Sequence, residues 1–240
     1  MINKLSDIVE NKLCLGCGLC QSIAGKDKIK VTMTKKGSLE PRQINSINKK
    51  TFNKILSTCP GILIRGPKTN LKNNNFKEDL IWGKYLDLFY SYSKNPHIRY
   101  ISSTGGVLNA IAIYLLKSKQ VDCIIHTAAS KNRPMRNIFK ISYTKKEIID
   151  GTSSRYGPSP TLEKINDILN KNINFAYIGK PCDISAIKNL EKIDSRVKKN
   201  CKFLLSIVCG GIPSLTKSKE ALKKNKIKEK DLSLFRYRGH

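Results

Sequence analysis

The chain has 240 residues, of which 40% are hydrophobic, so it can bury a core in one large domain or in a small module plus a domain. Its formal net charge is +27, but the lysines are spread along the whole chain, with no basic stripe interleaved with aromatic residues. This argues against nucleic-acid binding and leaves acidic partners, anionic ligands or a base-composition bias to explain the charge. No apolar run approaches the ~20 residues of a membrane span, and the N-terminus lacks the apolar stretch of a signal peptide, so we expect a cytoplasmic protein with reduced cysteines.

The first 65 residues are expected to form a small module around a cysteine-rich loop. Residues 5–13 can form a short helix that leads into this loop. Residues 28–34 alternate apolar and polar side chains as a half-buried strand does, and residues 49–57 have the apolar spacing of a helix. Residues 66–85, which begin with glycine and proline and contain three consecutive asparagines, are expected to be a linker.

The cysteine-rich loop carries the ligand pattern of a 4Fe-4S cluster. Cys14, Cys17 and Cys20 follow one another at three-residue spacing with glycines between them, so one short loop can wrap a single inorganic centre. Cys59 is followed by proline, as the last ligand of ferredoxin-type motifs usually is, and we predict it as the fourth ligand. Zinc is the main alternative, but it would normally use two separated pairs of cysteines, or histidines, and Cys59 stands alone. Free thiols without a metal are the third alternative, and such thiols would be exposed to oxidation.

From residue 86 onward, apolar runs of strand length alternate with helical stretches. Strands are expected at residues 86–92, 121–128, 138–143, 172–178 and 203–208, and helices at residues 107–116 and 183–190. This alternation predicts an α/β domain over residues 86–240 with a mixed, at least partly parallel sheet, and α+β is the alternative. In such sheets, ligands bind beyond the carboxyl ends of the strands.

Four loops have suitable chemistry for a ligand crevice at that edge. One places hydroxyls and glycines where a helix starts, so free N–H groups and the positive helix end could hold a phosphate or a flavin oxygen. A second adds a cation and a stacking ring, and the third and fourth, residues 179–183 and 209–214, each join a strand to a helix. Turn and cap geometry would also explain the glycines, serines and prolines of any single loop. The residues expected to bind the cofactor are Ser103, Thr104, Gly105, Gly106, Ser154, Arg155, Tyr156 and Lys180.

The remaining cysteines and histidines receive less specific predictions. Cys182 and Cys209 sit just before expected helices, where the helix dipole lowers a thiol pKa, so each could be a reactive thiolate, a ligand of an additional cluster or simply a packed residue. Cys123 and Cys201 are assigned to packing. Residues expected to pack or to lie on the surface are His97, His126 and His240, and Trp82 is expected to be a core or interface anchor.

With these motifs in hand, essentially the whole chain resembles the coenzyme F(420) hydrogenase/dehydrogenase beta-subunit family. The resemblance rests on the cysteine loop with Cys59-Pro60-Gly61 and on the runs at residues 103–107, 154–157, 179–183 and 209–214. It implies an iron–sulfur flavoprotein oxidoreductase in which the α/β domain holds FAD and a 4Fe-4S cluster relays single electrons. The flavin would then exchange a hydride or an electron pair with coenzyme F(420) or another organic substrate.

The resemblance also implies a redox protein partner, either a ferredoxin or a hydrogenase or dehydrogenase subunit. Some relatives carry a full second ferredoxin motif, of which only the last cysteine is present here, so we expect one cluster. Relatives continue past residues 234–240, so this chain is expected to be a fragment that lacks part of the pocket wall. The rival classes are a non-enzymatic electron-transfer subunit and a zinc- and nucleic-acid-binding module.

Overall fold

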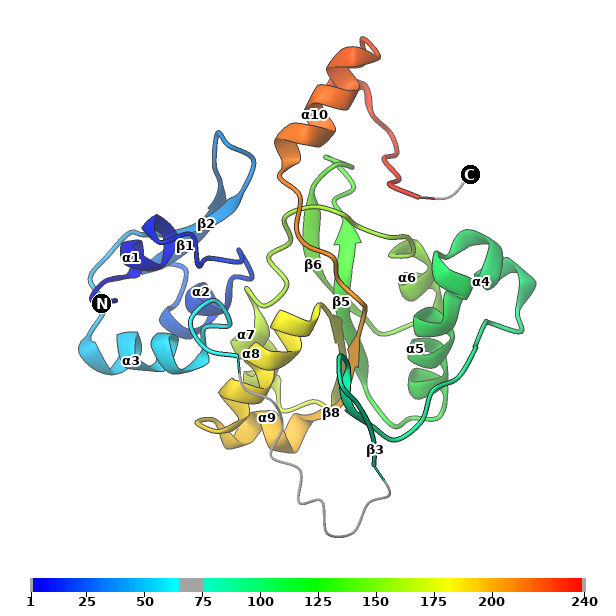
Figure 1. Cartoon of the computed structure of the whole chain (residues 1–240), viewed down its shortest axis with the longest axis horizontal. Helices are drawn as coiled ribbons and strands as arrows, with labels where there is room; N and C mark the ends of the chain where they lie inside the picture. The colour runs from blue at the N-terminus through cyan, green and yellow to red at the C-terminus, as the bar shows by residue number, and fades with distance from the viewer. Residues whose placement is uncertain (1, 65–75, 239–240) are drawn as a thin grey trace.

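A four-stranded mixed sheet with the strand order β6-β5-β7-β8 forms the centre of the molecule (Figure 1). The computed structural model describes residues 2–64 and 76–238. β5 pairs parallel with β7 and β7 parallel with β8, whereas β6 runs antiparallel to β5. The strands are β5 (Cys123–Ala129), β6 (Asn137–Ser142), β7 (Phe175–Gly179) and β8 (Cys201–Ser206). The predicted α/β fold with a mixed sheet is therefore confirmed.

Helices cover both faces of this sheet. Successive side chains of a strand point to opposite faces, so Ile125 packs into one core and its neighbour Ile124 into another. The core around Ile125 contains side chains from α7 (Ile165–Lys171), α8 (Pro181–Glu191) and α9 (Ser195–Asn200). The core around Ile124 contains side chains from α4 (Pro96–Ile101), α5 (Val107–Lys117) and α6 (Lys145–Asp150). After β8 the chain continues into α10 (Leu215–Lys224) and a short turn of 3-10 helix, η3 (Glu229–Asp231).

The N-terminal residues form a small module beside this sheet (Figure 1). It contains α1 (Leu5–Glu10), α2 (Leu19–Ala24), an antiparallel hairpin of β1 (Ile29–Met33) and β2 (Leu39–Gln43), and α3 (Lys49–Thr58). The expected strand and both expected helices of this region are present, although the first helix ends three residues early. α3 begins where the Asn48 side chain accepts a hydrogen bond from the Thr51 N–H, a standard N-cap.

The module has a small core of its own but also contributes to the central one. Leu5, Ile8, Ile29 and Ile55 pack together inside the module. Cys17 and Leu19, by contrast, belong to the core that includes Tyr177 of β7 and Ile187 of α8. The cysteine loop is therefore packed directly against the α/β domain.

The expected strand over residues 86–92 is wrong. These residues have no strand structure, and large side chains along the run, among them Leu88, Phe89 and Tyr90, are exposed. An apolar run of strand length does not specify a pairing partner, and this one pairs with no strand in the described part of the chain.

The segment before that run forms a hairpin. Residues 66–75, half of the linker expected over residues 66–85, lie outside the described residues, and the other half contains the hairpin of β3 (Lys77–Asp79) and β4 (Gly83–Tyr85). Trp82, in the turn of this hairpin, is 79% exposed, so it is not a core residue. No helix within residues 2–64 and 76–238 combines the length and the apolar character that a membrane span requires.

Candidate functional site

The four predicted cluster cysteines line one cavity in the N-terminal module. Cys14, Cys17 and Cys20 come from the loop between α1 and α2 and its first helical turn, and Cys59 caps the C-terminal end of α3. The remaining walls are mainly apolar, with side chains such as Leu5, Ile8, Val31 and Ile55. No His, Asp or Glu lines this cavity, so its donors are four sulfurs in an apolar enclosure. This donor set fits an iron–sulfur cluster.

Glycines shape the loop around the cavity. Gly16 and Gly18 have φ angles of +67° and +85°, in the left-handed region where glycine carries no steric penalty. A Cβ on Gly16 would lie 2.8 Å from the Leu39 carbonyl oxygen, and one on Gly18 would lie 2.8 Å from Cβ of Glu163. The Gly16 N–H donates to Sγ of Cys14 at 3.4 Å. The loop can therefore curl tightly around the sulfurs while resting on neighbouring backbone.

The electrostatics of the four thiols reflect their burial and their closeness. Burial raises the pKa of each thiol, that of Cys20 to about 12, and the charges of the other cysteines raise the pKa values of Cys14, Cys17 and Cys20 further. Within the described ranges, no three His, Cys, Asp or Glu side chains gather as a single metal ion would require.

A buried carboxylate links the cysteine loop to the strand ends of the sheet. Asp183, in the first turn of α8, is fully buried, and its side chain accepts hydrogen bonds from the Thr161 hydroxyl at 2.7 Å, the Lys180 backbone N–H at 3.0 Å and the Lys180 ammonium at 2.7 Å. Tyr177, also fully buried, donates its hydroxyl to the Thr161 carbonyl at 3.1 Å. One residue further on, the Leu162 N–H donates to the Cys17 carbonyl at 2.7 Å. This chain of hydrogen bonds holds the cysteine loop in register with the start of α8.

Two of the predicted cofactor-binding loops come together at the same edge of the sheet. The run Ser103, Thr104, Gly105 and Gly106 precedes the N-terminus of α5, and its last three residues form the 3-10 turn η2 (Thr104–Gly106). The backbone N–H of Ser154 donates to the Ser103 hydroxyl at 3.3 Å, so the second predicted loop touches the first. Asn109 of α5 fastens the contact by donating to the hydroxyls of Ser102 at 2.7 Å and Thr152 at 3.3 Å.

The first of these loops has an unusual backbone. Thr104, Gly105 and Gly106 all have positive φ angles, of +54°, +68° and +72°. A threonine in this region is an outlier, because its branched Cβ makes the left-handed conformation costly, and such strain is concentrated at functional sites. Thr104 is also exposed, so its side chain is accessible at the mouth of the loop.

Arg155 and Lys180, the two cations predicted to face the cofactor, are bound inside the protein. The Arg155 guanidinium donates to Oδ1 of Asn137 at 2.7 Å and to the carbonyls of Phe235 at 2.7 Å and Pro134 at 2.6 Å. It also stacks on the Tyr237 ring, with its central carbon 5.4 Å from the ring centroid. Arg155 therefore holds the segment after η3 against the start of β6. The Lys180 ammonium donates to Asp183, and both side chains keep N–H groups beyond these bonds.

Tyr156 remains exposed beside the segment after η3. Its ring packs edge-on against that of Tyr237, with centroids 5.7 Å apart, and its hydroxyl accepts a hydrogen bond from Arg238 at 3.3 Å. Hydrogen bonds from Arg238 and Ser154 lower the pKa of the Tyr156 hydroxyl. Tyr156 is therefore placed by the C-terminal segment, and its ring is accessible to a flat ligand.

Cys182 and Cys209 lie close enough that the charge of Cys209 affects Cys182. Burial, followed by the charge of Asp183, raises the pKa of the Cys182 thiol. This is opposite to the lowering expected from the helix dipole, so the structure does not favour a reactive thiolate at Cys182. Cys123 is fully buried in the central core and Cys201 packs against it, which confirms their assignment to packing.

Neither of the two described histidines, His97 and His126, lines the cysteine cavity. His126 is mostly buried and lies 2.8 Å from the Ser142 hydroxyl, and burial lowers its pKa to about 4. This confirms it as a packing residue, whereas His97 is exposed and His240 lies outside the described residues.

Sequence reasoning missed the residues that join the parts of the site: Asp183, Thr161, Asn109 and Asn137. Asp183 did carry a sequence signal. It is an acidic residue at the third position of a helix that follows a strand, and a capping box places its acidic residue there. The two asparagines offered no such signal, because the partners that join separate loops, Thr152 for Asn109 and Arg155 for Asn137, lie 43 and 18 residues away in sequence.

The fold and the cavity define a class of protein: an α/β protein with a four-thiol cavity whose loop packs into the core of its central sheet. Two family models, described as the N-terminal and C-terminal parts of the coenzyme F(420) hydrogenase/dehydrogenase beta subunit, match residues 88–166 and 173–240. The chain belongs to this family. Residues 1–87, which include the four cavity cysteines, lie outside these two matches.

Among solved structures, a chain of the F(420)-reducing nickel–iron hydrogenase complex from Methanosarcina barkeri has a similar fold. Its TM-score is 0.53 at 16% sequence identity, and the match covers 60% of this chain and 51% of that one. The protein described here therefore spans about half the length of its structural neighbour. A search of curated proteins found no match.

Proposed function

We propose that this chain is an iron–sulfur flavoprotein oxidoreductase that passes electrons between a 4Fe-4S cluster and FAD, and from FAD to coenzyme F(420) or another organic substrate. The observation that carries the proposal is the cavity lined by Cys14, Cys17, Cys20 and Cys59, because four sulfurs in an apolar pocket are the donor set of such a cluster. Family membership supports the redox role. The packing of Cys17 with side chains of β7 and α8 fixes the cysteine cavity to the domain that would hold the flavin.

The residues at the strand-end edge would bind and orient the flavin. The free N–H groups at the start of α5 and the backbone of Gly105 and Gly106 can donate to phosphate oxygens, and glycine lets a ligand approach the backbone closely. Tyr156 offers an exposed ring beside Ser154. When bound, a flavin accepts two electrons together and releases them one at a time, which matches a one-electron cluster to a two-electron substrate.

Binding of FAD can be measured without any assay of turnover. Titration of the purified protein with FAD, followed by quenching of flavin fluorescence, should show saturable binding of one FAD per chain. Thr104→Glu places a negative charge at the exposed mouth of the phosphate loop and should weaken binding at least about tenfold, or about 1.4 kcal/mol. Ser46→Glu adds the same charge at an exposed position of the cysteine module and should leave binding unchanged. If both variants bind FAD like the unmodified protein, the loop before α5 is not the flavin site.

A non-enzymatic electron-transfer subunit is the second candidate. The contacts of Arg155 and Lys180 favour this second candidate. Arg155 donates to the Phe235 carbonyl and Lys180 is paired with Asp183, so neither side chain is fully available to bind a diphosphate. In that case the unmodified protein would contain iron and sulfide but would neither bind FAD nor reduce it.

A further inference from the structure

A basic groove lies on the outer side of the helix that supplies Cys59. It is a shallow groove with a volume of about 640 Å³, lined by Lys49, Lys50, Asn53, Lys54 and Ser57 of α3 and by Ile193 of the turn between α8 and α9. The α3 residues in this set are all exposed and are spaced as one face of a helix is. Ile193, 44% exposed, adds an apolar contact to this face.

The same helix separates the groove from the cysteine cavity. Ile55, Thr58 and Cys59 line the cavity, while Lys54 and Ser57 line the groove, so the last turn of α3 has one side in each. An α-helix with its side chains is only about 10–12 Å across. A protein seated in the groove would therefore lie one helix diameter from the candidate cluster.

The net charge of the side chains at the groove is positive. Arg196 and, more weakly, Lys54 lower the pKa of Asp194, so one carboxylate lies within range of the Lys54 charge. Across the two described ranges, Lys49, Lys50 and Lys54 form no ion pair. Of the carboxylates beside Ile193, Asp194 is paired with Arg196 at 2.6 Å, and Glu191 is paired with Lys188. The exposed Lys192 adds a fourth positive charge next to Ile193.

We propose that this groove is the docking site for a small acidic one-electron carrier of the ferredoxin class, which exchanges electrons with the cluster across the last turn of α3. The inference rests on the proposed function, because it requires the cluster at Cys14, Cys17, Cys20 and Cys59. The exchange moves one electron and no atoms: the carrier is oxidised as the cluster is reduced, or the reverse. Complementary charge would steer the encounter, and steering of this kind raises association rates by about 10- to 1,000-fold at low salt.

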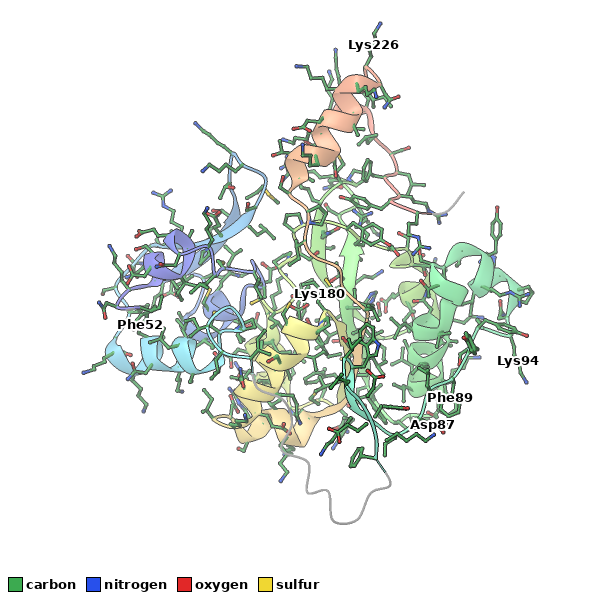
Figure 2. The ribbon with its side chains drawn as sticks, viewed as in Figure 1. Phe52, Asp87, Phe89, Lys94, Lys180 and Lys226 are labelled. Atoms are coloured by element: carbon green, nitrogen blue, oxygen red, sulfur yellow. The ribbon has the colours of Figure 1, made fainter. Side chains whose placement is uncertain are left out.

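The test compares two charge-reversed variants with the unmodified protein. The groove variant is Lys49→Glu, Lys50→Glu and Lys54→Glu, and the first two changes place acids in the first turn of α3, where they favour the helix. The control variant is Lys224→Glu, Lys226→Glu and Lys228→Glu, which makes the same change of charge at the exposed end of α10. Phe52 of α3 and Lys226 lie at different ends of the molecule (Figure 2).

Binding of an acidic 2[4Fe-4S] ferredoxin to each protein is measured by calorimetry, and reduction of the cluster by that ferredoxin is measured by stopped flow. We expect the groove variant to lose at least about tenfold in affinity and in second-order rate at low salt, and the control variant less than about twofold. Raising the salt concentration should abolish the difference. Equal losses in both variants, or no loss in either, would overturn the docking site.

The binding and iron measurements separate this inference from the proposed function. If the protein contains no iron but still binds ferredoxin through the groove, the docking site is supported and the proposed cluster is wrong. If the cluster is present and ferredoxin reduces it equally well in the unmodified protein and in both variants, the cluster is supported and the docking site is wrong.

Discussion

Single residues decide how the cysteine loop and the sheet edge are joined, and Asp183 is the most important of them. Its buried carboxylate is balanced by Lys180, whose side chain is only 12% exposed, and it accepts three hydrogen bonds in all. A buried charge is tolerated only when it is paired and hydrogen-bonded in this way. Asp183 is hydrogen-bonded to Thr161, and the next residue, Leu162, donates to the Cys17 carbonyl. A change at Asp183 should therefore also affect the cysteine loop.

Replacing Asp183 should therefore destabilise the protein and loosen the cysteine loop. Asp183→Asn removes the charge partner of Lys180, and we expect a loss of about 3 kcal/mol in the free energy of unfolding, measured by urea denaturation. The matched control is Glu220→Gln, which breaks the exposed pair with Lys217 and should cost less than about 1 kcal/mol. Hydrogen exchange at the Leu162 amide should also become faster in Asp183→Asn only. If exchange at Leu162 is unchanged, the carboxylate does not hold the cysteine loop.

At the scale of elements, sequence patterns worked where local chemistry decides the structure. The strand at Ile29–Met33 follows from the alternation of its side chains, and α8 follows from proline, cysteine and aspartate after a buried strand. The strand predicted at residues 86–92 is wrong because this segment has no neighbouring strand to pair with. Strand pairing depends on residues far away in sequence, so a short apolar pattern does not reveal it. The inward turn of Arg155 could not be foreseen for the same reason, because the Phe235 carbonyl lies 80 residues away in sequence.

The exposure of the β3–β4 hairpin leads to a prediction about tryptophan fluorescence. Trp82 is the single tryptophan of the chain and its side chain is 79% exposed. Its fluorescence should have the long-wavelength maximum of a hydrated indole and should be quenched by acrylamide nearly as strongly as free tryptophan. Phe52→Trp in the Trp82→Phe background moves the indole to a half-buried site on α3 and should give weaker quenching. A blue-shifted, protected signal from Trp82 would show that the hairpin is covered.

At the scale of the whole molecule, the two candidate sites are attached to opposite faces of one sheet. Cys17 and Leu19 of the cysteine loop pack into the core that includes Ile125, with side chains of β7 and α8. α5, which follows the first candidate flavin loop, packs into the core that includes Ile124. The sequence motifs identified the parts, whereas their placement on the two faces of one sheet is visible only in three dimensions.

The iron and sulfide content of the protein tests this account most directly. Protein purified without oxygen should contain about four iron and four sulfide per chain, the content of one cubane held by four cysteines. Cys17→Ser should lose most of that iron, whereas Cys201→Ser, at a packed cysteine outside the cavity, should keep it. One zinc per chain with no sulfide, or iron that Cys17→Ser does not reduce, would contradict the assignment of the cavity as an iron–sulfur site.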